Sequence, residues 1–324
     1  MAVRTRGRGS TPRMAASRTT VSTGAPSDCT VVMPPMSAAY AFSLAYIAVS
    51  AGLSLRFFRM RKLSLAAILI CAAAASNAQL VVTRSSAPAI LITAAGSVPG
   101  ANGTFFRSDL TVLNYRSSSQ NVQFQWMPQG SSGSGVAPLV LAIAPLSGVN
   151  SEDFVATILH QTGLGAIVIT GVTSTGAADP NAQLVATSRI WTPQPNATTG
   201  TNSQQFNGIP LSAINSGTLS LIGQRRDDRY RTNVGIVNLD TQTQTFRVDV
   251  LSSAGTESQL VIIPSQSLAQ VSLPGPNSTL PLQILVSSAS SSPTTAFMAY
   301  GSSVDNVTGD AWSSLGFNQP VPQP

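Results

Sequence analysis

The sequence predicts an all-β protein built from two tandem antiparallel β-sandwich modules. Three observations predict this class: a repeat runs through residues 106–301, apolar residues alternate with polar ones, and turn-forming clusters separate the alternating runs. The same region is rich in Ser, Thr, Val, Gln and Gly and poor in charge, which favours strands and turns over helices.

The repeat is visible as four matched segments. Residues 106–114 align with residues 230–238 at an offset of 124, and the alignment continues without a gap to Trp126 and Val250. Three later matches follow in the same order: 139–145 with 259–264, 166–169 with 282–285, and 184–188 with 297–301. Four matches in one order indicate an internal duplication.

Each matched segment is expected to form a strand. Val122, Phe124 and Trp126 alternate with glutamines, so we expect one face of this strand to be buried and the other to be exposed to solvent. The exception is residues 152–159, which we expect to form a short helix capped by Ser151. The predicted modules span 80–200 and 205–318, with 192–207 as their connector and 319–324 as a tail.

A secretory signal peptide is predicted at residues 60–78. Met60 is followed by Arg61 and Lys62, then by an apolar run over 63–75, and small residues precede a cleavage site after Ala78. We therefore expect a secreted or cell-surface protein whose mature chain begins at Gln79.

Residues 1–59 have two interpretations. Residues 37–55 carry no charge and are long enough to span a bilayer, so they could anchor the chain in a membrane if they are retained. Alternatively, translation starts at Met60 and the preceding residues form a mis-annotated or disordered leader. We favour the second interpretation, because an anchor followed at once by a complete signal peptide is redundant.

Charge and cysteine content separate the leader from the rest. The formal charge of +6 divides into nine basic residues against one acidic residue before Gln79 (+8) and nine against eleven after it (−2). A nucleic-acid binder is expected to carry a basic surface, so the mature part does not fit one. Cys29 and Cys71 both precede Gln79, which excludes disulfides, thiolate catalysis and Cys-based metal sites from the mature chain.

Several motifs resemble those of a known group. Residues 106–110, 230–238 and 304–310 resemble motifs of an uncharacterised group of secreted bacterial proteins with tandem immunoglobulin-like or related β-sandwich modules. The resemblance covers most of residues 90–315. It implies an exported surface or extracellular protein, and it brings no catalytic residues with it.

Two arginines occupy equivalent positions in the repeat. Arg107 and Arg231 are each followed by a hydroxyl residue and then by Asp or Asn. One interpretation is a repeated ligand clamp, since guanidinium groups bind carboxylates and sugar hydroxyls. The other, which duplication favours, is a structural arginine that ties a loop to a neighbouring acid. Asn114 and Asn238 are expected to end equivalent strands by bonding their own turns.

Residues 305–310 concentrate oxygen ligands. Asp305, Asn306 and Asp310 are candidates for a calcium site, although the spacing of an EF-hand is absent. The alternative, which we favour, is a hairpin turn with Gly309 at positive φ. Asp227 and Asp228 lie among four arginines and form either a self-neutralising loop or a polar recognition patch.

Tryptophans offer the remaining candidate binding site. Trp191 and Trp312 are expected to be more exposed than Trp126 and could stack on sugars. No catalytic motif, metal set or cofactor site is evident, so the expected function is non-enzymatic: a structural, adhesive or recognition role towards a surface glycan or protein. The alternatives are a carbohydrate-binding protein that uses these tryptophans and, less favoured, a carboxylate-dependent hydrolase.

Overall fold

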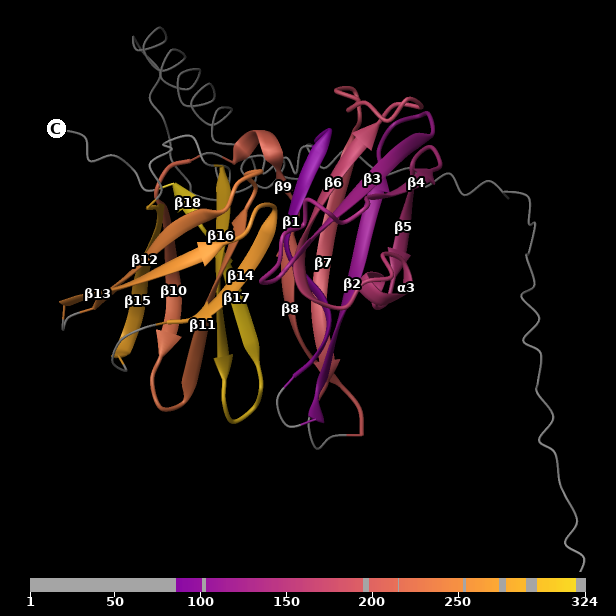
Figure 1. Ribbon diagram of the computed structural model, residues 1–324. Helices are drawn as coiled ribbons and strands as arrows, with labels where there is room; N and C mark the ends of the chain where they lie inside the picture. Colours follow the sequence, from indigo (N-terminus) through magenta and orange to yellow (C-terminus); the bar gives the residue numbers. More distant parts are fainter. Residues whose placement is uncertain are drawn as a thin grey trace, which may run out of the picture. The chain divides into compact units, whose positions relative to one another are not determined.

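The computed structural model confirms the all-β sandwich class, because antiparallel pairing accounts for every named strand (Figure 1). It describes residues 86–100, 103–194, 198–214, 216–252, 255–273, 278–289 and 296–318. The predicted leader, apolar segment 37–55, signal peptide and C-terminal tail lie outside these ranges. None of the helices in the described ranges has the length and apolar character needed to span a membrane.

The first module contains two sheets that are joined through strand β1. The first outer sheet has the order β5-β2-β7-β8: Ser147–Ser151, Phe105–Asn114, Leu184–Pro193 and Thr201–Asn207. The first inner sheet has the order β4-β3-β6-β1, with β9 paired to β1: Leu139–Ile143, Gln120–Pro128, Gly163–Val172, Ala89–Pro99 and Ile209–Pro210. The C-terminal end of β1 leaves the inner sheet and pairs with β2.

The second module repeats this plan. The second inner sheet has the order β14-β11-β16-β17: Ser267–Ser272, Tyr230–Asn238, Phe297–Asp305 and Ala311–Leu315. The second outer sheet has the order β13-β12-β15-β10-β18: Gly255–Ile263, Gln244–Ser252, Ser278–Ser288, Leu219–Arg226 and Phe317–Asn318. Each strand of the first module has a counterpart here, which confirms the duplication. The 3₁₀ turn η2 (Leu211–Ala213) follows β9.

Strand pairing corrects one of the sequence matches by a single residue. Phe124 lies opposite Ile169, and its counterpart Val248 lies opposite Val286. The offset between β6 and β15 is therefore 117, whereas matching 166–169 with 282–285 requires 116. Ile169 and Val286 are both fully buried. A slip of one residue in a strand would move every side chain to the opposite face, so burial decides the register.

The boundary between the modules also differs from the prediction. The expected connector over 192–207 contains β8, which pairs along its whole length with β7, and β9 then pairs with β1. Both strands have counterparts in β17 and β18, so the first module extends to Pro210. Phe206 is the single fully buried side chain of β8. This polar edge strand therefore lacks the alternation that marks the others.

The predicted helix is shorter than expected and begins differently. It is the four-residue α3 (Phe154–Thr157), and its N-cap is Asp153 with φ 51° rather than Ser151. The Ser151 hydroxyl instead bonds Thr157 Oγ1 and the Glu152 carbonyl. Phe154 of this helix is buried in the first module's core.

Asn114 and Asn238 form the same set of hydrogen bonds in both modules, which we call the asparagine lock. Each bonds its own turn, as predicted, and each also bonds the other sheet. Asn238 Nδ2 donates to the carbonyl oxygens of Gln242, Ile263 and Pro264 at 2.9, 3.2 and 2.8 Å. Asn114 makes the three equivalent bonds to Ser118, Ile143 and Ala144. Each lock joins the end of one sheet to the turn of the other.

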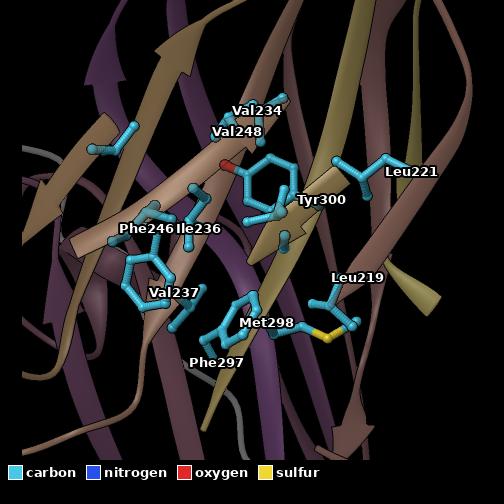
Figure 2. Close-up of a cluster of buried hydrophobic side chains, with 14 of the residues drawn as sticks. Leu219, Leu221, Val234, Ile236, Val237, Phe246, Val248, Phe297, Met298 and Tyr300 are labelled. Carbon is cyan, nitrogen blue, oxygen red and sulfur yellow. The ribbon is translucent and has the colours of Figure 1, made fainter. Parts of the chain in front are cut away.

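The two modules share a hydrophobic core. One buried cluster joins Leu91, Met127 and Ala166 of the first inner sheet to Val237 and Leu268 of the second inner sheet. Strand β14 contacts β3 and β6, and β1 contacts β11 and β16. Strands β1, β11 and β16 of the inner sheets are therefore buried on both faces, and the two inner sheets pack against each other. Figure 2 shows some side chains of this cluster, and those that it labels belong to the second module.

Aromatic and backbone contacts reinforce this packing. The rings of Phe206 and Tyr300 meet edge to face with centroids 5.1 Å apart. Burial raises the pKa of the Tyr300 hydroxyl, which stays neutral and donates to Gln270 Oε1 at 2.9 Å. At Gly133, a Cβ atom would lie 2.3 Å from the Gln266 carbonyl oxygen, so only glycine permits this approach of the first module to the second.

The strand order differs from that of a constant-type immunoglobulin domain in two respects. In that domain the fourth strand belongs to the sheet of the second and fifth strands, whereas here the fourth strand, β13, pairs with the third, β12. The other difference concerns the first and seventh strands of the immunoglobulin domain. There the seventh strand joins the sheet of the third and sixth strands. In the second module the first strand, β10, pairs with the sixth, β15, while the seventh, β16, pairs with the second, β11. The first and last of these seven strands have therefore exchanged sheets.

Asn238→Ala should lower the free energy of unfolding by about 2–4 kcal/mol, because it leaves three carbonyls near the core without their donor. Urea denaturation measures the change. Asn207→Ala, at an exposed position, is the control. An equal, small effect of both substitutions would refute the lock.

Phe206→Ala should lower the free energy of unfolding by about 3–5 kcal/mol. Because the core is shared, calorimetry should show both modules unfolding in one transition that moves to lower temperature. Phe317→Ala, at a side chain that is 43% exposed, should have a smaller effect. Two separate transitions, only one of which shifts, would contradict the shared core.

Candidate functional site

Equivalent ends of the two modules carry clusters of arginine, aspartate and aromatic side chains. In the first module, Arg107 on β2 lies with its Nε 3.8 Å from Asp153 Oδ2. Its guanidinium is 4.9 Å from the ring centroid of Phe105 and 5.7 Å from that of Trp191. Ser97 Oγ donates to the same carboxylate oxygen at 3.1 Å. Arg107 therefore has an acidic partner within its own module.

Trp191 is half-buried beside this cluster. Its Nε1 donates to Asp109 Oδ1 at 2.6 Å, and Asp109 Oδ2 accepts from Arg189 Nη1 at 3.2 Å. The Arg189 guanidinium also lies 5.9 Å from the indole centroid. The polar edge of Trp191 is thus engaged, and cationic groups contact its ring.

In the second module, residues 305–310 form the turn between β16 and β17. Asp305 Oδ2 accepts from Arg229 Nε and Nη2 at 2.8 and 2.7 Å, while Oδ1 accepts from the backbone N–H of Val307 at 2.8 Å. The bonds from Arg229, together with the backbone N–H of Val307, lower the pKa of Asp305. Gly309 has φ 74°, as the turn interpretation predicts.

The three candidate cation ligands of this turn are engaged within the chain. Both oxygens of Asp305 hold the turn and Arg229, and Asn306 Oδ1 accepts from Arg231 Nη1 at 2.5 Å. Asp310 Oδ1 accepts from the backbone N–H of Ala311 at 3.0 Å. The described ranges contain no group of three or more His, Cys, Asp or Glu side chains able to hold a metal.

Asp227 organises the loop between β10 and β11. Its Oδ1 accepts from the backbone N–H groups of Arg229 and Tyr230, each at 2.9 Å, and its Oδ2 accepts from Arg225 at 3.3 Å. Desolvation acts to raise the pKa of Asp227, but these bonds outweigh it and the net pKa is lowered. Arg225 lies 4.3 Å from the Tyr230 ring centroid.

Trp312 also contacts Tyr230. The two rings meet edge to face with centroids 5.5 Å apart, and Trp312 Nε1 donates to the Gly223 carbonyl at 3.0 Å. Trp312 is half-buried, like Trp191. The structure therefore places the two tryptophans in separate modules, each beside a different arginine cluster.

A hollow of about 250 Å³ opens beside Tyr230. Two guanidinium groups line it, those of Arg226 and Arg231. The remaining lining residues are Asp227, Tyr230, Thr232, Ser272, Leu273 and Asn306. Sequence analysis singled out Arg231 and Asn306 but did not bring them together. Arg226 was included among the four arginines around Asp227 and Asp228, in the possible polar recognition patch. Ser272 was missed, because only the pairing of β14 with β11 brings it next to the other residues.

A second hollow, of about 410 Å³, lies where the modules meet. Met127, Val168, Leu211 and Ile214 give it an apolar wall, and Gln125 and Gln266 add amide groups. It holds no cluster of ionisable groups.

Comparison of the chain with protein-family models, with curated proteins and with solved structures gives no match.

Asp305→Asn should lower the thermal midpoint at pH 7, because it removes the negative charge and leaves one oxygen where two accept from Arg229 and from the turn. The folded-state pKa lies below the ordinary 3.8, so the contribution of Asp305 is present above that value and is lost as the pH falls through the lowered pKa. Thermal melts from pH 7 to pH 2 measure it.

The wild type and Asp305→Asn should therefore converge at the acid end. Asp310→Asn, on the same turn, is the matched control and should stay close to the wild type throughout. A difference between wild type and Asp305→Asn that persists unchanged at pH 2 would contradict the electrostatic account.

Proposed function

We propose that this chain is an exported, non-enzymatic β-sandwich protein with a structural, adhesive or recognition role at the cell surface or outside the cell. The observation that carries the proposal is the core shared by the two modules. A pair of sandwiches packed face to face forms a single body that can hold its loops at fixed separation. Such a body suits a spacer or a recognition module.

The acidic side chains support a non-catalytic role. Asp179, Asp227, Asp249 and Asp305 each have a lowered pKa. A general acid near neutral pH needs a raised pKa, so these four carboxylates are poor proton donors. Each is bonded to arginine as well, which is the arrangement of structural ion pairs.

Export and an immunoglobulin-related origin belong to the same proposal. The basic start, apolar run and small-residue site at 60–78 support export. Two pairings support the relationship to immunoglobulin-like modules: β11 with β14 and β12 with β15 correspond to strands B with E and C with F. The resemblance to secreted bacterial proteins with tandem modules supports the same location.

Export predicts a defined N-terminus. Intact mass and N-terminal sequencing of the natively expressed protein, from separated cell fractions, should give a chain that begins at Gln79 in the periplasm or the medium. Changing Ala78 to Arg should block this cleavage, because the site requires a small residue. A membrane-bound product that retains residues 1–59 would overturn the proposal and identify 37–55 as an anchor.

A further inference from the structure

The duplication lets the two arginine clusters be compared position by position. Arg107 and Arg231 occupy the same place on equivalent strands, β2 and β11. In the first module β5 ends at Ser151, opposite Leu110, and Asp153 follows two residues later. In the second module β14 continues to Ser272, opposite Asn233, and the Leu273 N–H donates to the Thr232 carbonyl. Counted along the chain from the paired residues, positions 153 and 273 correspond. Residue 153 is the aspartate that pairs with Arg107, whereas residue 273 is leucine. The second module therefore has the equivalent arginine, Arg231, but has leucine at the position of its acidic partner.

A second substitution adds charge at the same place. The pairs Ala95–Gly165 and Gln224–Leu282 are equivalent, and two residues further along the chain Ser97, which bonds Asp153 in the first module, corresponds to Arg226. The pairing of β10 with β15 shifts register between Gln224 and Arg226. Ser97, Arg107 and Asp153 therefore form a neutral group in the first module. Their counterparts Arg226, Arg231 and Leu273 carry two positive charges and line the hollow.

Both arginines of the hollow are positioned, and both keep spare donors. Arg226 Nη1 donates to the Leu273 carbonyl at 2.6 Å, and Arg231 Nη1 donates to Asn306 Oδ1 at 2.5 Å. A guanidinium has five N–H donors, so one neutral acceptor leaves most of them available. Among the described residues, neither arginine forms an ion pair within 4.0 Å.

The neighbouring carboxylates pair with other groups rather than with Arg226 or Arg231. Asp227 is held by Arg225 and two backbone N–H groups, and Asp305 is held by Arg229. Asp228 is exposed and has an interaction of its own. The loop therefore neutralises two of its four arginines internally, and the two that line the hollow face solvent.

We propose that the hollow binds the carboxylate of a uronic acid unit in an acidic saccharide. The ligand carboxylate takes the place that Asp153 occupies beside Arg107, between the guanidinium groups of Arg226 and Arg231. This inference deepens the proposed recognition role and rests on it.

The rest of the lining fits a saccharide better than a bare carboxylate. Ser272 and Asn306 supply hydroxyl and amide groups that can bond sugar hydroxyls, and Tyr230 supplies an aromatic side. The Thr232 hydroxyl is buried and already donates to the Arg225 carbonyl, so it only shapes the wall. A hollow of about 250 Å³ has room for one sugar unit rather than for a long chain. The site differs from the two tryptophan platforms, whose indole N–H groups are already bonded within the chain.

The test is a titration of the purified protein with D-glucuronate, with glucose and with acetate at pH 7 and low salt, followed by NMR chemical shifts. Glucuronate should bind with a dissociation constant on the order of 1 mM, and glucose and acetate should bind at least about tenfold more weakly. The shifts should centre on Arg226, Arg231 and Asn306.

Near-isosteric variants separate binding from folding. Asn306→Asp places a carboxylate on Arg231, as Asp153 does on Arg107, and should abolish glucuronate binding while the thermal midpoint is retained or rises. Arg231→Gln and Arg226→Gln should each weaken binding by about tenfold or more. Arg107→Gln, the equivalent change in the first module, should leave binding unchanged.

Three outcomes would overturn the inference: no glucuronate binding, binding that survives Asn306→Asp and Arg231→Gln, or acetate binding as tightly as glucuronate. The last would make any carboxylate, such as that of an acidic peptide, an equal ligand. Export without glucuronate binding would remove this inference alone. Binding by a chain that is never exported would leave the site and remove the proposed location.

Discussion

The structure depends on the packing of one sandwich against the face of the other. Strand β1 sends Ile92 into the first module's core and Leu91 into the core shared with the second, so both of its faces are buried. Strand β11 does the same with Ile236 and Val237, both fully buried. A strand that is buried on both faces has no solvent-exposed side. Each module therefore covers one face of the other's inner sheet.

The duplication has preserved backbone geometry more strictly than side-chain chemistry. Leu146 and Gln266 are unlike residues at one equivalent position, yet they have φ values of 49° and 46°. Next to the asparagine locks, Arg116 bonds Gln120 in one module, and Asp240 bonds Gln244 in the other. The charge is reversed while the contact remains. The clusters around Arg107 and Arg231 differ more. Arg107 has Asp153 beside it, whereas the corresponding residue in the second module is Leu273.

The sequence predicted what depends on periodicity and missed what depends on pairing. Alternation around Trp126 placed its side chain in the core, where it is 2% exposed. The polar strand β8 gave no alternation, so the first module was expected to end too early. Short aliphatic runs can be aligned in two registers, which explains the slip at β6.

The candidate site was only partly visible for the same reason. Arg231 and Asn306 were noted separately, because 75 positions separate them in the chain. The contrast between Asp153 and Leu273 requires the register of β5 and β14, which no local pattern reveals. The turn at 305–310 was predictable, since Gly309 supplies the positive φ that such a turn needs.

The order in which the two copies meet bears on self-assembly. The second inner sheet is the counterpart of the first outer sheet, so the copies join front to back rather than by a two-fold axis. A contact of this kind is open-ended, and repetition of it would build a filament. The first outer sheet, at one end of this stack, carries the Asp109–Arg189 ion pair. The second outer sheet, at the other end, carries the Arg247–Asp249 ion pair. Burying such pairs requires their dehydration, which opposes the addition of a further copy at either face.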